Sequence, residues 1–360
     1  MNTSALIFGG NGKTGLSYRR YLARTLKHDL WNVYDASAQE HPLENFDGEG
    51  QWSQEIPTID ILHSYHSIYI TPGIDLKKLY PGESLECLNL ISDIEIFLQE
   101  DASFKIGITG TNGKSTCCYQ LSQLLESSQV IGNFGPTVLD HMNSGKKYSI
   151  IEISSFQLER INTKILDFGV LLNISPDHID RHGTFKEYSK IKKRILEAKV
   201  STTENDPFKI FSMITGVHHD QNRILKRLPH RLEEIGPDVN DSKSTNLASL
   251  QFAINQMNGS YYLLLCGNPR KEEYLSFQVQ GPQKIFIFGK HAETINQKIQ
   301  HDVECVISPG NLRSLMLNIR DHHPRLPILF SPGHPSGRDY KNFEERGNDF
   351  KFLLSEIFDD

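Results

Sequence analysis

The chain has 360 residues, with 38 lysine and arginine side chains against 44 aspartate and glutamate side chains, and a formal net charge of −6. This length suggests two or three domains, and 38% hydrophobic with 23% charged residues is ordinary for a globular protein. The negative charge argues against a general basic field for nucleic acid, and no apolar run approaches the roughly 20 residues that span a membrane.

The N-terminal residues and the cysteine pattern indicate in which cellular compartment the protein is expected. The first ten residues lack the basic start and the long apolar core of a secretion signal. The five cysteines have no metal-binding spacing, and their number is odd. We therefore expect a protein of the reducing cytoplasm, without membrane insertion.

The first region reads as strand, glycine-rich turn, helix and strand, over residues 5–8, 9–15, 16–27 and 30–35. The turn is suited to a diphosphate, and Asp35 ends the second strand. These two features together are typical of Rossmann-like nucleotide binding. A tight strand–helix connection without any ligand explains the same pattern. Another strand is expected within 67–74, and residues 75–103 are expected to carry the first linker.

The segment 104–116 is the most informative part of the chain. An apolar stretch precedes the glycine-rich run 110–116, and a helical pattern follows it. Glycines allow main-chain N–H groups to surround phosphate oxygens, Lys114 adds a positive charge, and a Ser115 or Thr116 hydroxyl can hold Mg²⁺. Gly107 lies one residue too far from Gly113 for the strict Walker pattern, but nucleotide binding is still favoured over an ordinary strand–turn–helix.

Strands at 129–131, 148–153 and 167–173 alternate with helices, which predicts a doubly wound parallel sheet. Glu152 ends one of these strands, where it could reach Mg²⁺ or simply be solvated.

A loop follows the strand at 167–173. It gathers ionisable groups around His178, which favours a ligand site over a structural histidine.

A basic helix is expected over 184–199. Such a run is usually a solvated face, although one lysine could point inward. Residues 201–229 are polar and weakly patterned, and they give no assignment.

The last region alternates again, with strands at 261–266, 284–288 and 326–331 and a closing helix at 339–358. A turn rich in serine and glycine before that helix is a natural carboxylate site. Three α/β domains are therefore predicted, at residues 1–93, 94–228 and 229–360.

Taken in chain order, these segments resemble the Mur ligases. The matching segments span nearly the whole chain: 71–74, 92–97, 110–116, 132–133, 152–159, 172–182, 228–231, 240–246 and 341–347. The segments 154–157 and 341–347 are most similar to the members that join D-glutamate to UDP-N-acetylmuramoyl-L-alanine. The resemblance implies an N-terminal Rossmann-like domain for the UDP moiety, a central P-loop domain for ATP and a C-terminal Rossmann-like domain for the amino acid.

The resemblance also implies a reaction and its residues. ATP would phosphorylate the substrate carboxylate, and the amine of D-glutamate would attack the acyl phosphate. Catalysis is assigned to Lys114, Glu152, His178 and Lys192. Two Mg²⁺ ions are assigned to Ser115, Glu152, His178 and Lys192, with Lys192 carbamylated. ATP is assigned to Gly110, Thr111, Asn112, Gly113, Lys114, Ser115, Thr116, Asn222, Arg231 and Asp241. The other substrates are assigned to Gly12, Lys13, Thr14, Asp35, Gly73, Asn133, Thr245, Ser336 and Phe343.

The chain departs from the family between Lys199 and Leu228, where it is shorter. The stretch 216–222 corresponds to a family segment near adenine, with His219 in place of an asparagine. This leaves two alternatives to an active D-glutamate ligase that acts as a monomer. One is a degenerate, non-catalytic protein that still binds a nucleotide sugar, and the other is a related ATP-dependent amide ligase with another amino acid. A nicotinamide dehydrogenase would leave most of the chain unexplained.

Overall fold

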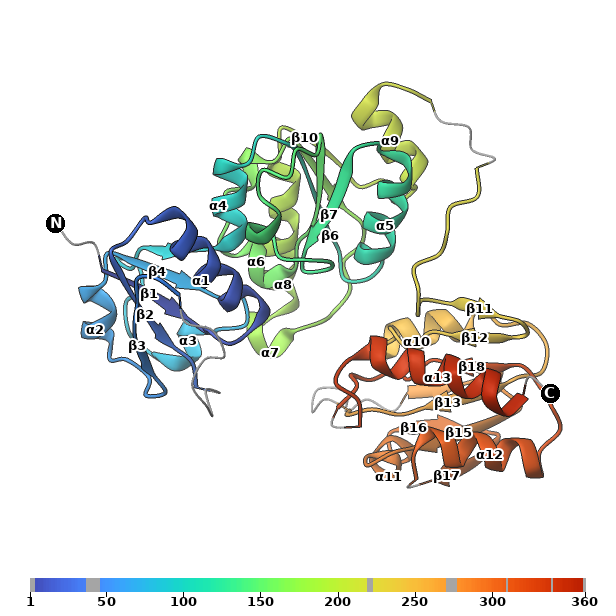
Figure 1. The fold of residues 1–360 in the computed structure, drawn as a ribbon. Coiled ribbons are helices and arrows are strands. Elements are labelled where there is room, and N and C mark those ends of the chain that lie inside the picture. The colour runs from blue at the N-terminus through green and yellow to red at the C-terminus, as the bar shows by residue number, and fades with distance from the viewer. Residues whose placement is uncertain are drawn as a thin grey trace. The chain divides into compact units, whose positions relative to one another are not determined.

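The structure is a computed structural model that describes residues 4–36, 46–218, 223–269, 277–308, 310–337 and 339–358. The chain forms two compact units, Met1–Leu225 and Lys226–Asp360. The first unit holds two five-stranded sheets, and the second unit holds a six-stranded sheet (Figure 1). This mixed α/β architecture with parallel sheets confirms the predicted fold class.

The first sheet has the order β3-β2-β1-β4-β5, and all of its strands are parallel. Its strands are β1 Ser4–Phe8, β2 Leu30–Tyr34, β3 Glu49–Ser53, β4 Ser67–Ile70 and β5 Leu90–Ile91. Its helices are α1 Lys13–Thr25, α2 Ile59–Ser64 and α3 Leu76–Leu79. The strand order reverses at β1, so the loops after β1 and β4 border the crevice where Rossmann-like sheets bind ligands. We call residues 4–91 the first domain.

The second sheet has the order β10-β9-β6-β8-β7, again with parallel strands. Its strands are β6 Phe104–Thr109, β7 Ser128–Gly132, β8 Tyr148–Glu152, β9 Phe168–Leu171 and β10 Val200–Thr202. The helices are α4 Asp93–Glu100, α5 Lys114–Leu124, α6 Ser155–Leu158, α7 Ile179–His182, α8 Phe185–Lys193 and α9 Pro207–Thr215. The phosphate-loop candidate follows β6, where this sheet changes direction. We call residues 93–218 the central domain.

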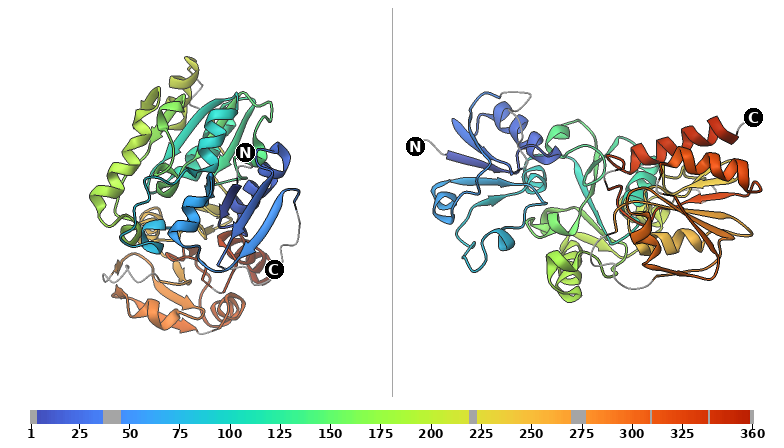
Figure 2. Two further views of the ribbon diagram at one scale, coloured as in Figure 1. Left: turned by 90° about the vertical axis from the view of Figure 1, so that its left-hand side faces the viewer. Right: turned by 90° about the horizontal axis from the view of Figure 1, so that it is seen from below.

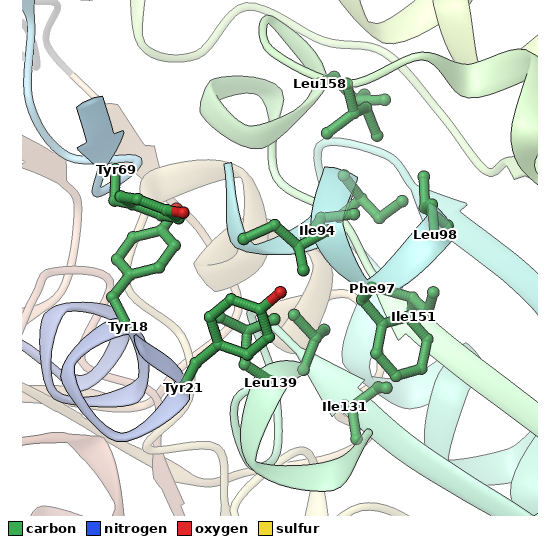
Figure 3. Close-up of a cluster of buried hydrophobic side chains, with 14 of the residues drawn as sticks. Tyr18, Tyr21, Tyr69, Ile94, Phe97, Leu98, Ile131, Leu139, Ile151 and Leu158 are labelled. Atoms are coloured by element: carbon green, nitrogen blue, oxygen red, sulfur yellow. The ribbon is translucent and has the colours of Figure 1, made fainter. Parts of the chain in front are cut away.

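A shared hydrophobic core joins the first and central domains. Figure 3 shows tyrosines from the first domain next to aliphatic and aromatic side chains from the central domain. The labelled residues are Tyr18, Tyr21, Tyr69, Ile94, Phe97, Leu98, Ile131, Leu139, Ile151 and Leu158. Because this apolar contact is continuous, the two domains form one unit, in agreement with the contact between α1 and the turn Leu139–His141.

Helix α9 was not predicted, because residues 201–229 gave no assignment. Asp206 caps its N-terminus by accepting a hydrogen bond from the N–H of Phe208, and Pro207 occupies its first turn. Ile210 and Phe211 pack into the core that lies under α5. Figure 1 shows α9 beside α5. The short segment after β10 therefore ends the central domain with one covering helix.

The second unit is built on the sheet β11-β12-β18-β13-β15-β17, in which only β11 runs antiparallel. Its strands are β11 Glu233–Ile235, β12 Asp238–Asn240, β13 Tyr262–Leu265, β15 Lys284–Phe288, β17 Glu304–Ser308 and β18 Ile328–Phe330. A separate pair joins β14 Phe277–Val279 to β16 Ile299–His301. The helices are α10 Leu247–Ile254, α11 Ala292–Asn296, α12 Leu312–His322 and α13 Phe343–Phe358, and α12 lies beside α13 (Figure 2).

Several predicted boundaries were wrong by a few residues. Helix α1 begins at Lys13 rather than at 16, and α13 begins at Phe343 rather than at 339. The basic helix ends at Lys193 and continues as a 3₁₀ turn, Arg194–Glu197. Residues 75–103, which were expected to carry the first linker, contain α3, β5 and α4. Within the described residues, no helix has both the length and the apolar character needed to cross a membrane.

Candidate functional site

The first unit contains a cavity of about 720 Å³ at the carboxyl ends of strands from both of its sheets. The first domain supplies the loops after β1, β2 and β4, and the central domain supplies the loops after β6, β7, β8 and β9 together with α8. Among the predicted site residues, the cavity is lined by Gly12, Lys13, Thr14, Asp35, Gly73, Thr111, Lys114, Asn133, His178 and Lys192. Residues far apart in the sequence are therefore brought to one place.

The glycine-rich turn after β1 packs tightly against the start of α1. A Cβ atom at Gly15 would lie 2.0 Å from the carbonyl oxygen of Gly9, so no larger residue fits. Gly12 has no atom within 4 Å of such a position and lines the cavity. Asp35 accepts a hydrogen bond from the main-chain N–H of Asn11 at 2.7 Å, which holds the turn against the end of β2.

The phosphate-loop candidate has the expected form. Gly113 adopts a φ of +84°, a value that favours glycine, and α5 starts at the next residue. Lys114 Nζ donates hydrogen bonds to the carbonyl oxygens of Gly110 and Thr111, both at 2.9 Å. The Asn112 N–H donates to Asn173 Oδ1 at 2.9 Å, which ties the loop to the end of β9. The loop is thus preformed, with its lysine inside.

Lys192 is the inward lysine of the basic helix. Its side chain is 2% exposed, whereas Lys186, Lys190 and Lys193 are exposed. Lys192 Nζ donates to the carbonyl oxygen of Gly110 at 2.9 Å and to Thr109 Oγ1 at 3.3 Å. Burial lowers the pKa of Lys192 to about 7, and the positive charge of Lys114 acts in the same direction.

Glu152 ends β8 and is buried. Its Oε1 accepts a hydrogen bond from Asn133 Nδ2 at 2.6 Å, whereas its Oε2 is buried without a hydrogen-bond partner. A buried carboxylate oxygen without a partner is costly unless a cation or donor meets it. Glu152 therefore fits an oxygen ligand of a bound cation.

His178 lies at the start of α7 with a φ of +52° and lines the cavity. Its Nε2 is 3.5 Å from Asp177 Oδ2, and its ring lies 5.0 Å from that of Phe156. Among the described residues, no three or more histidine, cysteine, aspartate or glutamate side chains form a group that could hold a metal ion. This donor set does not suit an all-protein metal cage, but it fits Mg²⁺, which is often bound by one or two carboxylates and substrate phosphates.

Other predicted residues lie outside the cavity lining. Gly110, Asn112, Gly113, Ser115 and Thr116 belong to the phosphate loop and to the first turn of α5 without lining the cavity, and Glu152 lies behind Asn133. Asn222 lies outside the described residues. Arg231, Asp241, Thr245, Ser336 and Phe343 belong to the second unit.

In the second unit, Asp241 is 1% exposed and accepts hydrogen bonds from Ser331 Oγ at 2.8 Å and from the Leu232 N–H at 3.2 Å. Burial raises the pKa of Asp241 to about 6, although Arg231 at 3.8 Å opposes this shift. Asp241 and Ser331 follow β12 and β18, which are neighbouring parallel strands.

Buried Arg346 connects further loops of the second unit. Its guanidinium donates to Ser242 Oγ at 3.0 Å and to the His334 carbonyl at 3.1 Å, and Ser242 Oγ in turn donates to the Phe343 carbonyl at 2.9 Å. Ser336 and Phe343, which were predicted to bind the amino-acid substrate, thus lie on segments that Arg346 links together.

Sequence reasoning assigned no site role to several cavity residues, among them Ser154, Ser155, Phe156 and Tyr188. A signal for the first three exists, because Ser154 and Gln157 form a reciprocal capping box directly after the strand that ends at Glu152. Tyr188 lies four residues before Lys192, so both occupy the same face of α8.

Comparisons with known proteins agree with this architecture. A family model described as the Mur ligase middle domain matches residues 108–211. The UDP-N-acetylmuramoylalanine--D-glutamate ligase of Francisella tularensis subsp. tularensis (strain SCHU S4 / Schu 4) is 26% identical over 418 aligned positions, covering 98% of this chain and 96% of that protein. The protein of the same name from Buchnera aphidicola subsp. Schizaphis graminum is 28% identical over 373 positions, covering 81% of this chain and 84% of that protein.

Two solved structures share the fold. The MurF ligase from Thermotoga maritima in complex with ADP matches with a TM-score of 0.56 and 13% identity, covering 98% of this chain and 95% of that chain. A pseudomurein peptide ligase type C from Methanothermus fervidus matches with a TM-score of 0.52 and 15% identity, covering 99% of this chain and 100% of that chain.

The alignment with the Francisella protein is longer than the 360 residues of this chain, so that relative has segments without a counterpart here. This agrees with the expected shortening, and the location of the loss after Lys199 stays a prediction. The chain is thus similar to the Mur ligase middle domain over residues 108–211 and to two proteins named UDP-N-acetylmuramoylalanine--D-glutamate ligase over most of its length, and it shares the fold of two solved ligases.

Proposed function

We propose that the chain is an ATP-dependent ligase that adds D-glutamate to UDP-N-acetylmuramoyl-L-alanine during synthesis of peptidoglycan precursors. The observation that carries this proposal is the single cavity in which the glycine-rich turn of the first domain faces Lys114, Asn133, His178 and Lys192 of the central domain. The names of the curated relatives support the choice of substrates.

The chemistry requires activation of a carboxylate, which is a poor electrophile. A carboxylate oxygen attacks the γ-phosphorus of ATP, ADP leaves, and an acyl phosphate forms. The amine of D-glutamate then attacks the acyl carbon, phosphate leaves with that oxygen, and the nitrogen loses a proton. Lys114 would stabilise the negative charge on the transferring phosphoryl group, and Asn133 would orient the reacting carboxyl group.

Mg²⁺, when bound, would neutralise the charge of the phosphates and so favour attack by a second anion. Ser115 and Glu152 would hold one ion, and His178 and Lys192 would hold a second. The unpartnered buried Oε2 of Glu152 supports the first assignment.

Lys192 would serve as a metal ligand only after carbamylation. The neutral amine attacks carbon dioxide and releases a proton, which converts a cation into a carbamate anion. A pKa of about 7 supports this step, because a large fraction of the amine is neutral near neutral pH. The carbamate would also replace the repulsion between Lys192 and Lys114 with attraction.

In the second unit, Thr245, Ser336 and Phe343 would bind D-glutamate. Arg231 and Asp241, together with Asn222, would contact ATP. Support comes from the position of Asp241 and Ser331 after neighbouring parallel strands, the edge at which α/β sheets bind ligands.

One observation favours a second candidate, a non-catalytic protein that binds only the nucleotide sugar. The chain lacks segments that its Francisella relative has, and the expected loss lies near the adenine site.

A phosphate-release assay with purified protein, ATP and Mg²⁺ separates the two candidates. The proposed ligase releases phosphate only when UDP-N-acetylmuramoyl-L-alanine and D-glutamate are both present. Well-folded protein that binds the nucleotide sugar without turnover would favour the second candidate. In a panel of amino acids, preference for another amino acid would indicate a related amide ligase.

A further inference from the structure

Two arginines of the central domain reach across to the first domain and hold a wall of the cavity. We propose that Arg160 and Arg181 are positioning residues for the UDP-linked substrate, acting through the loop Thr71–Ile74. This inference rests on the proposed function, because it concerns the substrate of the same cavity.

The loop Thr71–Ile74 follows β4, and all four of its residues line the cavity. Within the first domain, Thr71 Oγ1 donates to the Phe8 carbonyl at 3.3 Å, and Ile74 packs against a hydrophobic cluster. The Thr71 N–H donates to the Phe8 carbonyl at 3.1 Å, and the Ile74 N–H donates back to the Thr71 carbonyl at 3.2 Å. The carbonyl oxygen of Thr71 can accept a second hydrogen bond besides that from the Ile74 N–H, because a carbonyl oxygen has two lone pairs.

Arg160, which follows α6, takes up both carbonyl groups. Its NH1 donates to the Thr71 carbonyl oxygen at 3.2 Å, and its NH2 donates to the Ile74 carbonyl oxygen at 2.7 Å. The rigid fork of a guanidinium can span two acceptors in a fixed geometry, which the single ammonium of lysine cannot reproduce. Arg160 thus fixes both ends of the loop at once.

Arg181 extends the contact to the next residue of the first domain. Its NH1 lies 3.5 Å from Asp75 Oδ2, and its NH2 donates to Glu159 Oε2 at 3.1 Å. Its guanidinium also lies 5.1 Å from the centre of the Phe156 ring, another part of the cavity lining. The two arginines and the two carboxylates balance in charge, which offsets part of the cost of their partial burial.

The same group of side chains also reaches Ser155 at the start of α6. His182 Nδ1 lies 3.1 Å from Glu159 Oε1, and His182 Nε2 lies 3.0 Å from Ser155 Oγ. Ser155 lines the cavity. The loop of the first domain and the start of α6 are therefore set relative to each other through one connected group of side chains.

Docking of the two domains does not depend on this group. The hydrophobic core of Figure 3 already joins them, and other polar contacts cross between them, among them the pair of hydrogen bonds from Arg20 to Asp140 at 2.9 Å and 2.5 Å. Arg20 and Asp140 do not line the cavity. Loss of Arg160 should therefore loosen the wall without separating the domains.

The test compares Arg160→Met and Arg160→Lys with the matched control Arg20→Met, which removes a guanidinium from the same domain interface. For each variant, KM for the three substrates, kcat and the melting temperature are measured. Binding of UDP-N-acetylmuramoyl-L-alanine is measured by calorimetry without ATP, so that it needs no turnover.

We expect Arg160→Met to raise KM and Kd for the UDP-linked substrate by roughly 10- to 100-fold, the scale of a small misplacement in a site. KM for ATP should stay close to that of the wild type, Arg160→Lys should recover part of the loss, and Arg20→Met should leave all three KM values near those of the wild type.

If Arg160→Met does not fold, Asp75→Asn provides the second variant. Asp75 caps α3 by accepting a hydrogen bond from the Lys78 N–H, and asparagine can keep this cap while losing the charge that faces Arg181. For Asp75→Asn, KM for the UDP-linked substrate should rise by up to about fivefold, which is the effect expected from the loss of a partly exposed ion pair.

An equal rise of all KM values, the same effect from Arg20→Met, or an unchanged KM for the UDP-linked substrate would overturn the inference. If the wild type binds the UDP-linked substrate but shows no turnover, the proposed function fails while the binding comparison still decides the role of Arg160. If the wild type does not bind this substrate, both proposals are wrong.

Discussion

The carbonyl oxygen of Gly110 accepts hydrogen bonds from two lysines, Lys114 and Lys192. Two cations on one acceptor repel each other, and burial adds to the cost of the charge on Lys192. The buried oxygen of Glu152 that lacks a partner is a second unfavourable feature of the same region. A carbamate on Lys192 would remove the repulsion between the two lysines, and Mg²⁺ would give the Glu152 oxygen a partner. Both unfavourable features are therefore expected to disappear when the site holds its metal ions.

Lys192→Met should therefore lower kcat by roughly 10²- to 10³-fold, because the variant cannot form the carbamate that would hold the second ion. Lys190→Met is the matched control, since Lys190 is an exposed lysine on the same helix. Depletion of bicarbonate should slow the wild type, and added bicarbonate should not restore Lys192→Met. A variant with the wild-type rate would rule out this role for Lys192.

Asp93 gives a prediction for stability rather than activity. It is buried in the first turn of α4, its Oδ1 has no hydrogen-bond partner, and burial raises its pKa from 3.8 to about 6. Lys13 and the N–H of Ile94 oppose this shift. Because the folded state binds the proton more tightly, Asp93 stabilises the fold as pH falls from above 6 towards 4 and costs stability at neutral pH.

Asp93→Asn should accordingly raise the free energy of unfolding at pH 7 by roughly 1–3 kcal/mol, and this difference from the wild type should shrink as the pH falls towards 4. Urea titrations of both proteins at several pH values provide the measurement. A difference that does not depend on pH would show that the carboxyl group is not the cause.

At single positions, the sequence indicated which residues gather at the cavity, but not whether each side chain is buried. Residue type and motif spacing selected Lys114 and His178, and the family resemblance added Asn133 and Lys192; all four line one cavity. The sequence pattern did not show which lysine of the basic helix points inward, because all the lysines of this run are alike in sequence whether they are exposed or buried. The contacts of Arg160 and Arg181 with the first domain could not be predicted either, since they join residues that are far apart in the chain.

Secondary-structure elements were predicted best where strand, glycine-rich turn and helix follow each other directly. In the turn after β1, Gly15 is required for packing, whereas Gly12 has open space around it. The two glycines thus differ in function although they belong to one motif.

Gly15→Ala should destabilise the first domain by about 1–3 kcal/mol or more, because its Cβ would clash with the main chain of Gly9. Gly12→Ala should leave the melting temperature nearly unchanged, since its φ of −73° suits alanine, and should affect only ligand binding. Thermal unfolding of both variants distinguishes the positions. Equal losses of melting temperature would contradict this assignment.

Several of the elements that escaped prediction are short strands, although the 11-residue helix α12 was not predicted either. β3, β5 and β10 have five residues or fewer, and such strands owe their form to neighbours in the sheet rather than to their own pattern. Helix α9 did carry a local signal, the aspartate cap followed by proline, but the polar residues on both sides hid it.

At the scale of the whole molecule, the first unit combines the proposed UDP and phosphate sites in one cavity, and the second unit carries the proposed amino-acid residues on a separate sheet. Two hydrophobic clusters belong entirely to the second unit, so its sheet has cores of its own. The collinear order of motifs allowed the three large α/β sheets to be predicted, whereas the consequence of the shortening relative to the Francisella protein could not be predicted in the same way.

The central claim is that the chain joins an amine to a carboxylate through an acyl phosphate. It is tested most directly with UDP-N-acetylmuramoyl-L-alanine that carries ¹⁸O in its terminal carboxylate, supplied with ATP, Mg²⁺ and D-glutamate. Because the attacking oxygen leaves with the phosphoryl group, we predict that the released inorganic phosphate contains one ¹⁸O atom for each amide bond formed. Unlabelled phosphate, or the absence of both phosphate and amide product from folded protein, would contradict the claim.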